Sequence, residues 1–167
     1  MNTCTVIDDI GCVGASEKKR LLNEVKRSGA VSPAMRASAR TTPVTMPGLS
    51  NIVAIGAGSS FVCALKADHT VWCWGGNSGN ELGDGTGTDS NVPVPVATAG
   101  SPPDTYKAIA AGNGHTCAIA MDATAWCWGS DTGGRLGNGS GAGSSLIPTA
   151  VDTSGGGPSA YTHITSG

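Results

Sequence analysis

Cysteines are the residues of this 167-residue sequence whose spacing points most directly to chemistry. Six are present, and four of them form two pairs that are ten residues apart: Cys63 with Cys73, and Cys117 with Cys127. In an antiparallel hairpin, Cys63 lies opposite Cys73 and both point to one face. Because the pairing recurs at the same register, two disulfides are favoured, each stabilising by roughly 2–3 kcal/mol. Two buried thiols per hairpin are the alternative.

Cys4 and Cys12 complete the set and could close a small loop. A tetrahedral metal site is the weaker interpretation, since no second cysteine pair or histidine lies near them. An even cysteine count is compatible with three disulfides, which indicate an oxidising compartment. We therefore expect an extracellular or cell-surface protein, although residues 1–14 show no ordinary secretory signal; a cytoplasmic location is the alternative.

One loop could hold a hard cation. Oxygen-bearing side chains alternate with glycines over residues 84–89, where Asp84 and Asp89 would be the calcium ligands. The equivalent stretch, residues 138–143, has no carboxylate. We therefore favour a turn-rich loop and expect neither a metal nor a cofactor.

The remaining candidate groups do not form a reacting set. The three histidines are not clustered in sequence and show no pattern of a metal site or catalytic base; they are His69, His115 and His163. No nucleophile, base and acid occur together, so we expect no enzymatic activity, and a hydrolase or lyase is the least favoured class. Asn138 begins an Asn-Gly-Ser sequon and is a glycosylation candidate.

The elements that position the cysteines are internal repeats. The segment Val-Trp-Cys-Trp-Gly at residues 71–75 returns at an offset of 54 as Ala-Trp-Cys-Trp-Gly, and each copy precedes a Leu-Gly-x-Gly loop. Strands at 61–65 and 71–74 form a hairpin whose two faces are both apolar, as expected for a sheet between two others. Four tryptophans are expected in the core of the repeats: Trp72, Trp74, Trp126 and Trp128.

The repeats divide the chain into four parts. Residues 51–105 and 106–160 are complete copies, and residues 161–167 match the first strand of a third. Residues 1–50 contain the cysteine loop, a basic helix expected at 16–28, and an extended Pro-containing arm. The helix has only three apolar residues on one stripe, so a solvated helix packed on its own domain is favoured over docking to an acidic partner or an anionic membrane surface.

Composition supports this division and limits the partners. Glycine is abundant and charged residues make up only 13%, which suits short strands joined by tight turns. Residues 51–167 carry three Lys/Arg against eight Asp/Glu, a net charge of −5. Since no basic stripe is present, we expect no nucleic acid partner. No apolar run is long enough for a transmembrane helix.

The two copies resemble the repeats of the regulator of chromosome condensation family, in the form common in bacterial secreted and surface proteins. The resemblance rests on His-Thr-Cys-Ala-Ile, Val-Trp-Cys-Trp-Gly, Leu-Gly-x-Gly and a Pro-Val exit. It implies an all-β fold of two propeller-type blades, a partial β-propeller, preceded by the short helix and the arm. The family fold typically has seven four-stranded blades, whereas this chain has two and a fragment.

Two functions follow as expectations. Two blades leave an apolar face at each end, so the first is a non-enzymatic extracellular structural or adhesive protein that self-assembles through blade ends and terminal strands, as in a fibre or pilus-like subunit. Its partners would be copies of itself, other propeller repeats, or a surface ligand or glycan. The alternative is a protein-binding module with a small-GTPase or chromatin partner, by analogy with the family.

Overall fold

The computed structural model describes residues 5–6, 12–13, 48–98, 103–141 and 143–166, and every regular element among them is a strand. The helix expected at 16–28, the arm up to residue 47 and the pairing of Cys4 with Cys12 lie outside the described residues. The described residues contain no helix that is long and apolar enough to cross a membrane.

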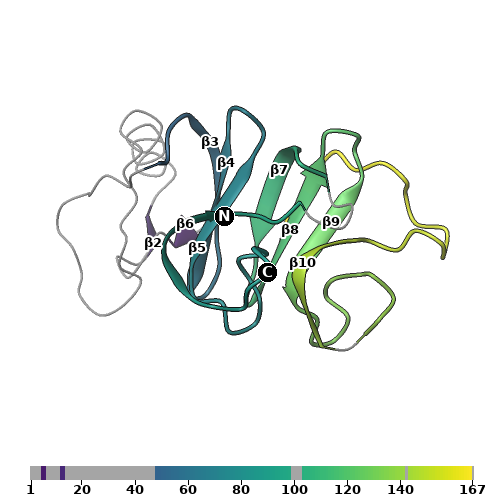
Figure 1. The fold of residues 1–167 in the computed structure, drawn as a ribbon. Coiled ribbons are helices and arrows are strands. Elements are labelled where there is room, and N and C mark those ends of the chain that lie inside the picture. The colour runs from purple at the N-terminus through teal and green to yellow at the C-terminus, as the bar shows by residue number, and fades with distance from the viewer. Residues whose placement is uncertain (1–4, 7–11, 14–47, 99–102, 142, 167) are drawn as a thin grey trace.

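Two four-stranded antiparallel sheets stand side by side and form the body of the molecule (Figure 1). Blade 1 contains β3 (Ile52–Ala57), β4 (Phe61–Lys66), β5 (Val71–Gly75) and β6 (Ser90–Pro95) in sequence order. Blade 2 repeats this meander with β7 (Tyr106–Ala111), β8 (His115–Ala120), β9 (Ala125–Ser130) and β10 (Ser144–Ala150). A small pair, β1 (Thr5–Val6) and β2 (Cys12–Val13), lies apart from the two blades in the sheet topology. The expected all-β fold of two propeller-type blades is confirmed.

The central hairpin of each blade has the register that the cysteine spacing predicts. Cys63 pairs with Cys73 across β4 and β5, and Cys117 pairs with Cys127 across β8 and β9. Both pairs are disulfides. Tight turns at residues 67–70 and 121–124 connect the strands, and we call this end of the two blades the turn end.

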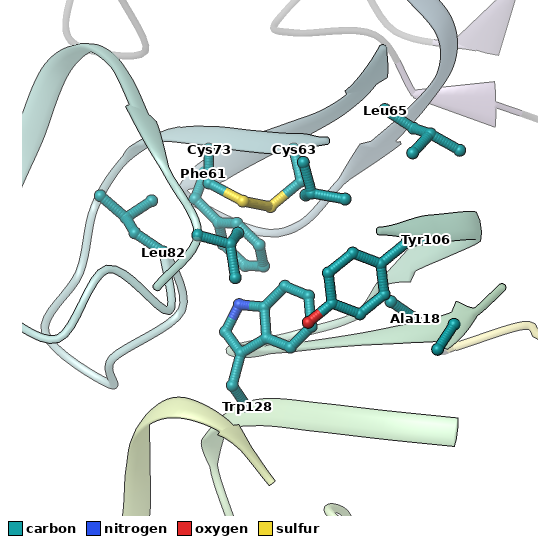
Figure 2. Packing of buried hydrophobic residues seen from close by; sticks show 11 residues of the cluster. Phe61, Cys63, Leu65, Cys73, Leu82, Tyr106, Ala118 and Trp128 are labelled. Carbon is teal, nitrogen blue, oxygen red and sulfur yellow. A yellow bond between two sulfur atoms is a disulfide. The ribbon is translucent and has the colours of Figure 1, made fainter. Parts of the chain in front are cut away.

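The two apolar faces of blade 1 belong to two different clusters. The face that carries the Cys63–Cys73 disulfide packs against blade 2, and the other face packs around Trp74. Figure 2 shows Trp128 and Tyr106 extending from blade 2 toward that disulfide, with Phe61 and Leu82 beside the indole. The main core therefore lies between the blades, as the apolarity of both hairpin faces predicts.

Residues 161–166 lie in the register of a third repeat but form no strand in the structure. The amide of Tyr161 donates to the Ala123 carbonyl at 2.8 Å, as the amide of Tyr106, one repeat earlier, donates to the His69 carbonyl at 2.8 Å. Ile164 packs on blade 2 beside the Cys117–Cys127 disulfide. A strand needs a neighbour with which to pair, and among the described residues no hairpin lies next to this segment.

Candidate interaction surfaces: the blade interface and the turn end

The blade interface is organised around one backbone carbonyl. Trp128 is fully buried, and its indole Nε1–H donates to the Glu81 carbonyl at 2.9 Å. The Thr116 hydroxyl donates to the same oxygen at 3.1 Å. Both lone pairs of this acceptor are therefore used by blade 2, which orients the indole as well as burying it. We call the receiving surface, Glu81 O with Leu82 and Gly83, indole site 1.

Gly83 gives the indole room to approach. A Cβ at this position would lie 2.5 Å from Cδ1 and Nε1 of Trp128, far inside van der Waals contact. The backbone there is also left-handed, with φ of +64°, where glycine carries no steric penalty. The Leu-Gly-x-Gly motif thus places a carbonyl and an open backbone directly beneath a tryptophan of the next blade.

Further hydrogen bonds connect the blades away from the indole. The Asn80 side chain donates to the Ser144 hydroxyl at 2.6 Å, and the amide of Gly85 donates to the Leu146 carbonyl at 3.0 Å. These two contacts join the loop between β5 and β6 to β10. The bond between His69 and Tyr106 described above joins the turn of blade 1 to β7. The two blades are therefore held in one relative orientation.

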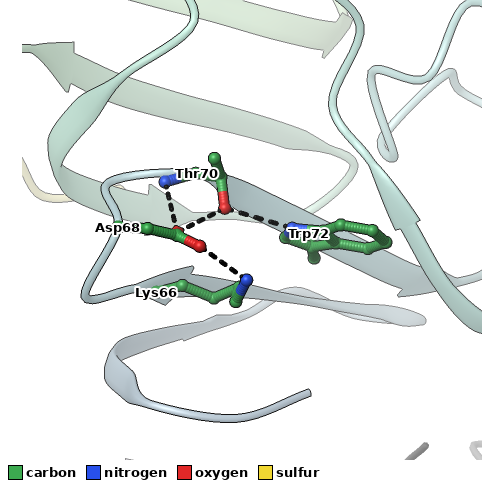
Figure 3. A network of polar contacts seen from close by, with 4 residues as sticks. All are labelled: Lys66, Asp68, Thr70 and Trp72. Atoms are coloured by element: carbon green, nitrogen blue, oxygen red, sulfur yellow. Dashed lines mark hydrogen bonds and ion pairs between the residues drawn. The ribbon is translucent and has the colours of Figure 1, made fainter. Parts of the chain in front are cut away.

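The turn end carries the same polar network in both blades. In blade 1, the Asp68 carboxylate accepts from the amide and hydroxyl of Thr70 at 3.1 and 2.6 Å, and the Thr70 hydroxyl accepts from the Trp72 indole at 3.2 Å (Figure 3). Lys66 adds an ion pair to Asp68 at 2.7 Å and lies 5.7 Å from the centroid of the Trp72 ring. The network fixes the tight turn through short-range side-chain bonds.

Blade 2 repeats this network with Asp122, Thr124 and Trp126. Ala120 stands where blade 1 has Lys66, so the second aspartate lacks the ion pair formed by the first. Trp72 and Trp126 are therefore half-buried residues that hold the turns, whereas Trp74 and Trp128 are buried. Trp72 and Trp126 pack against the core clusters as partly buried residues, because they lie at the strand end nearest the turn.

Both turn aspartates are stabilised as anions. The ion pair with Lys66 and the hydrogen bonds from Thr70 lower the pKa of Asp68 to about 2, and the bonds from Thr124 lower the pKa of Asp122. Met121, next to Asp122, exposes 50% of its surface. The turn of blade 2 therefore presents a carboxylate beside an exposed methionine, and methionine is a residue type enriched in protein–protein interfaces.

The suspected calcium ligands form hydrogen bonds within their own loop. The Asp84 carboxylate accepts from Thr86 and from the Asn77 side chain, and Asp89 accepts from the Asn77 amide at 2.8 Å. Within the described ranges, no three His, Cys, Asp or Glu side chains gather as a metal site would require. In this structure the two carboxylates shape the loop.

The other two polar candidates lie in blade 2. Asn138 is half-buried, and its side-chain oxygen accepts from the amide and hydroxyl of Ser140 at 3.0 and 2.7 Å, so the sequon forms a closed local turn. His115 is buried and its Nδ1 has no hydrogen-bond partner. Burial, together with the positive charge of Arg135, lowers its pKa. The three histidines do not come together with a carboxylate or cysteine in any metal-binding group of the described residues.

Two groups at the blade interface were not predicted from the sequence. The Glu81 carbonyl is a backbone atom, so no side-chain pattern points to it. Thr116 stands where blade 1 has Val62, and a comparison of the two repeats at the offset of 54 shows this exchange of valine for a hydroxyl. That comparison could have identified Thr116 as a polar contact of blade 2.

These observations define the class of protein. Two disulfide-bridged four-stranded blades pack through a tryptophan inserted on a Leu-Gly loop, which is the architecture of a partial β-propeller. Two sequence profiles of the regulator of chromosome condensation (RCC1) repeat match the chain, one at residues 68–119 and the other at residues 52–80 and 106–135. Together they span residues 52–135, half of the chain. The chain belongs to the RCC1 repeat family.

Known proteins of several kinds share these repeats. The chain is 34% identical over 118 residues to the Ultraviolet-B receptor UVR8 of Arabidopsis thaliana, covering 69% of the chain and 26% of UVR8. It is 29% identical over 89 residues to the human E3 ubiquitin-protein ligase HERC2, covering 53% of the chain and 2% of HERC2. It therefore spans only a small part of the length of these relatives.

Solved structures support the fold. Prp20p from Saccharomyces cerevisiae, described together with its binding properties to Gsp1p and histones, superposes with a TM-score of 0.61 at 23% identity, covering 75% of this chain and 32% of Prp20p. Human WBSCR16 superposes with a TM-score of 0.64 at 20% identity, covering 75% and 31% of the two chains. At these identities the likeness shows a shared blade architecture.

Proposed function

We propose that this chain is a non-catalytic protein-binding module that contacts a basic protein through the turn end of its blades. The observation that carries the proposal is the repeated aspartate turn, which two rigidly joined blades present at the same end. Asp122 is the central residue, because it lacks the ion pair that Asp68 forms with Lys66 and lies beside the exposed Met121.

Charge supports a basic partner. The repeat region, residues 51–167, carries a net charge of −5. Both turn aspartates are ionised at neutral pH, since an aspartate already is at its ordinary pKa and theirs are lowered further. Complementary charge chiefly increases association rate and specificity. Among proteins of this architecture, Prp20p is described as binding Gsp1p and histones, which supports a role in protein binding.

The experiment measures binding of two purified probes, core histones as basic proteins and Gsp1p as a small-GTPase-type partner, to the immobilised chain by interferometry. Asp122→Asn removes the charge but keeps the side-chain oxygen that accepts from Thr124. Asp89→Asn is the control, because it makes the same charge change next to β6, at the opposite end of the blade. Loss of an interface charge pair is worth up to about 1 kcal/mol, or about fivefold in Kd.

We expect the histones to bind, with an affinity that falls as salt rises, and Asp122→Asn to weaken binding about fivefold while Asp89→Asn leaves it unchanged. Equal effects of the two variants would refute the turn end as the contact surface. If neither the histones nor Gsp1p binds, the proposal of a basic partner is refuted.

A second candidate is the self-assembling extracellular structural protein. Its support is the pair of disulfides in the blades, which favour an oxidising compartment. The relatives named above favour the binding module and give no support to a fibre or adhesive role. Light scattering of the oxidised chain separates the two candidates, since a monodisperse monomer would rule out the fibre.

A further inference from the structure

The turn of blade 1 contains a binding site for an ammonium group, and the chain's own Lys66 fills it. The Nζ of Lys66 lies 2.7 Å from Oδ2 of Asp68 and 5.7 Å from the centroid of the Trp72 ring (Figure 3). A tryptophan ring attracts a cation placed over its face, and the carboxylate balances the positive charge. We call Asp68 Oδ2 together with the Trp72 ring ammonium site 1.

The turn of blade 2 has the same backbone and the same internal bonds. In each turn, the amide of the last strand residue donates at 2.9 Å to the carbonyl of the threonine four residues later. The residues at the tip, His69 and Ala123, both have a left-handed backbone, with φ of 68° and 73°. In each turn the threonine hydroxyl also donates to the aspartate at 2.6 Å and accepts from the indole. We call Asp122 Oδ2 together with the Trp126 ring ammonium site 2.

No ammonium from the described part of the chain occupies ammonium site 2. Ala120 stands at the position of Lys66, so the side chain that fills site 1 is missing. Thr124 bonds only Oδ1 of Asp122, and no described group donates to Oδ2. The pKa of Asp122 is lowered by the bonds from Thr124 and, to a smaller extent, by the charge of Lys107, which forms no ion pair with this carboxylate in the described structure.

The surroundings of ammonium site 2 suit a lysine side chain from outside. Asp122 is exposed, and Trp126 keeps part of its surface exposed. Met121, adjacent in the chain, exposes 50% of its surface. A lysine lays its methylene stem along apolar surface while its ammonium stays hydrated or paired. The turn therefore offers a carboxylate and an aromatic ring for the charge, and an apolar side chain for the stem.

We propose that ammonium site 2 binds the side-chain ammonium of a lysine on the partner protein, in the place that Lys66 takes in blade 1. The inference rests on the proposed function and names the group that the turn end recognises. The partner's lysine would donate to Asp122 Oδ2 and lie over the Trp126 ring. Because Lys66 already fills site 1, only one of the two turns is open to the partner.

The test titrates the isotope-labelled chain with a lysine octamer and follows the indole N–H signals of the four tryptophans by NMR. Trp72→Phe and Trp126→Phe identify the two turn signals, and the buried indole of Trp128, held at indole site 1, is the internal reference. An octamer acetylated on every Nζ is the control ligand, because it keeps the stems and loses the charges. Asp122→Asn removes the charge of site 2 alone.

Lys66→Ala is the decisive variant, because it empties ammonium site 1. Lys107→Ala is its matched control, since it removes the same charge near the turn end and leaves Lys66 in place. In the unmodified chain we expect the octamer to shift the Trp126 signal saturably and to leave the Trp72 signal unmoved. Lys66→Ala should make Trp72 respond as well, whereas Lys107→Ala should not.

We expect Asp122→Asn to weaken the response of Trp126 about fivefold, and the acetylated octamer to produce none. A Trp72 signal that stays unmoved in Lys66→Ala, or that already responds in the unmodified chain, would overturn the proposal. Histone binding that depends on Asp122 without any response of Trp126 to the octamer would overturn ammonium site 2 and leave the proposed function standing. A response of Trp126 with no binding of histones or Gsp1p would support the site and refute the basic protein partner.

Discussion

Replacing Trp128 by phenylalanine tests the organisation of the blade interface, and Trp74→Phe provides the control. The two indoles occupy equivalent positions in β9 and β5 and expose 0% and 1% of their surface. They differ in one respect: the Trp128 N–H donates to the Glu81 carbonyl, whereas the buried Trp74 N–H has no partner.

The magnitude follows from this difference. Both substitutions remove the same atoms from a buried site, so the cost of the lost packing is similar in the two variants and largely cancels in the comparison. Trp128→Phe also loses a hydrogen bond worth about 1 kcal/mol. Trp74→Phe instead removes a buried unsatisfied donor, whose presence costs about 1–3 kcal/mol. We therefore expect Trp128→Phe to be the more destabilising change by about 2 kcal/mol or more.

Equilibrium urea unfolding of the oxidised chain, followed by far-ultraviolet circular dichroism, measures the difference. For a small domain with m of about 1–3 kcal/mol per molar urea, 2 kcal/mol corresponds to a difference in midpoint of about 1 M. If Trp74→Phe were as destabilising as Trp128→Phe, or more so, the bond to the Glu81 carbonyl would not be what distinguishes the two tryptophans, and the account of the interface would fail.

Two further predictions concern blade 2. Burial lowers the pKa of His115 from its ordinary 6.5, so the unfolded state binds the proton more readily than the folded state. The contribution of His115 to the unfolding free energy should therefore be level above pH 6.5 and fall as the pH drops below it. His115→Phe, which copies Phe61 of blade 1, should flatten this part of the profile in urea titrations; an unchanged slope would contradict it. Cys117–Cys127 is slightly exposed, whereas Cys63–Cys73 is fully buried. Under limiting dithiothreitol, alkylation mapping should therefore find Cys117–Cys127 reduced first. Simultaneous reduction of the two disulfides would contradict this difference in solvent exposure.

The hairpins could be read from the sequence because their signals are local. A spacing of ten residues between cysteines, with alternating apolar residues on both sides, fixes the register of β4 with β5 and identifies the two faces. A slip of one residue would separate Cys63 from Cys73 and exchange the faces of the sheet. The second copy repeats the same constraint, so the duplicated blade follows from the first.

The depth of each tryptophan could not be read in this way. Trp72 and Trp74 lie on one face of the strand and are indistinguishable by alternation. Their burial depends on how far each lies from the turn and on what packs over it, which is decided by other segments. The acceptor of Trp128 is likewise a backbone atom 47 residues away in the chain, and contacts of that range leave no periodic signal.

The equivalent faces of the two blades, which carry Trp74 in blade 1 and Trp128 in blade 2, also differ in polarity. Thr116 and Val62 are equivalent residues, but only the threonine meets a carbonyl, that of Glu81 on the neighbouring blade. The valine lies in an apolar cluster with Trp74, whose N–H finds no acceptor. The face of blade 1 around Trp74 is therefore poorly matched to a carbonyl-bearing loop, whereas the equivalent face of blade 2, with Trp128 and Thr116, fits one.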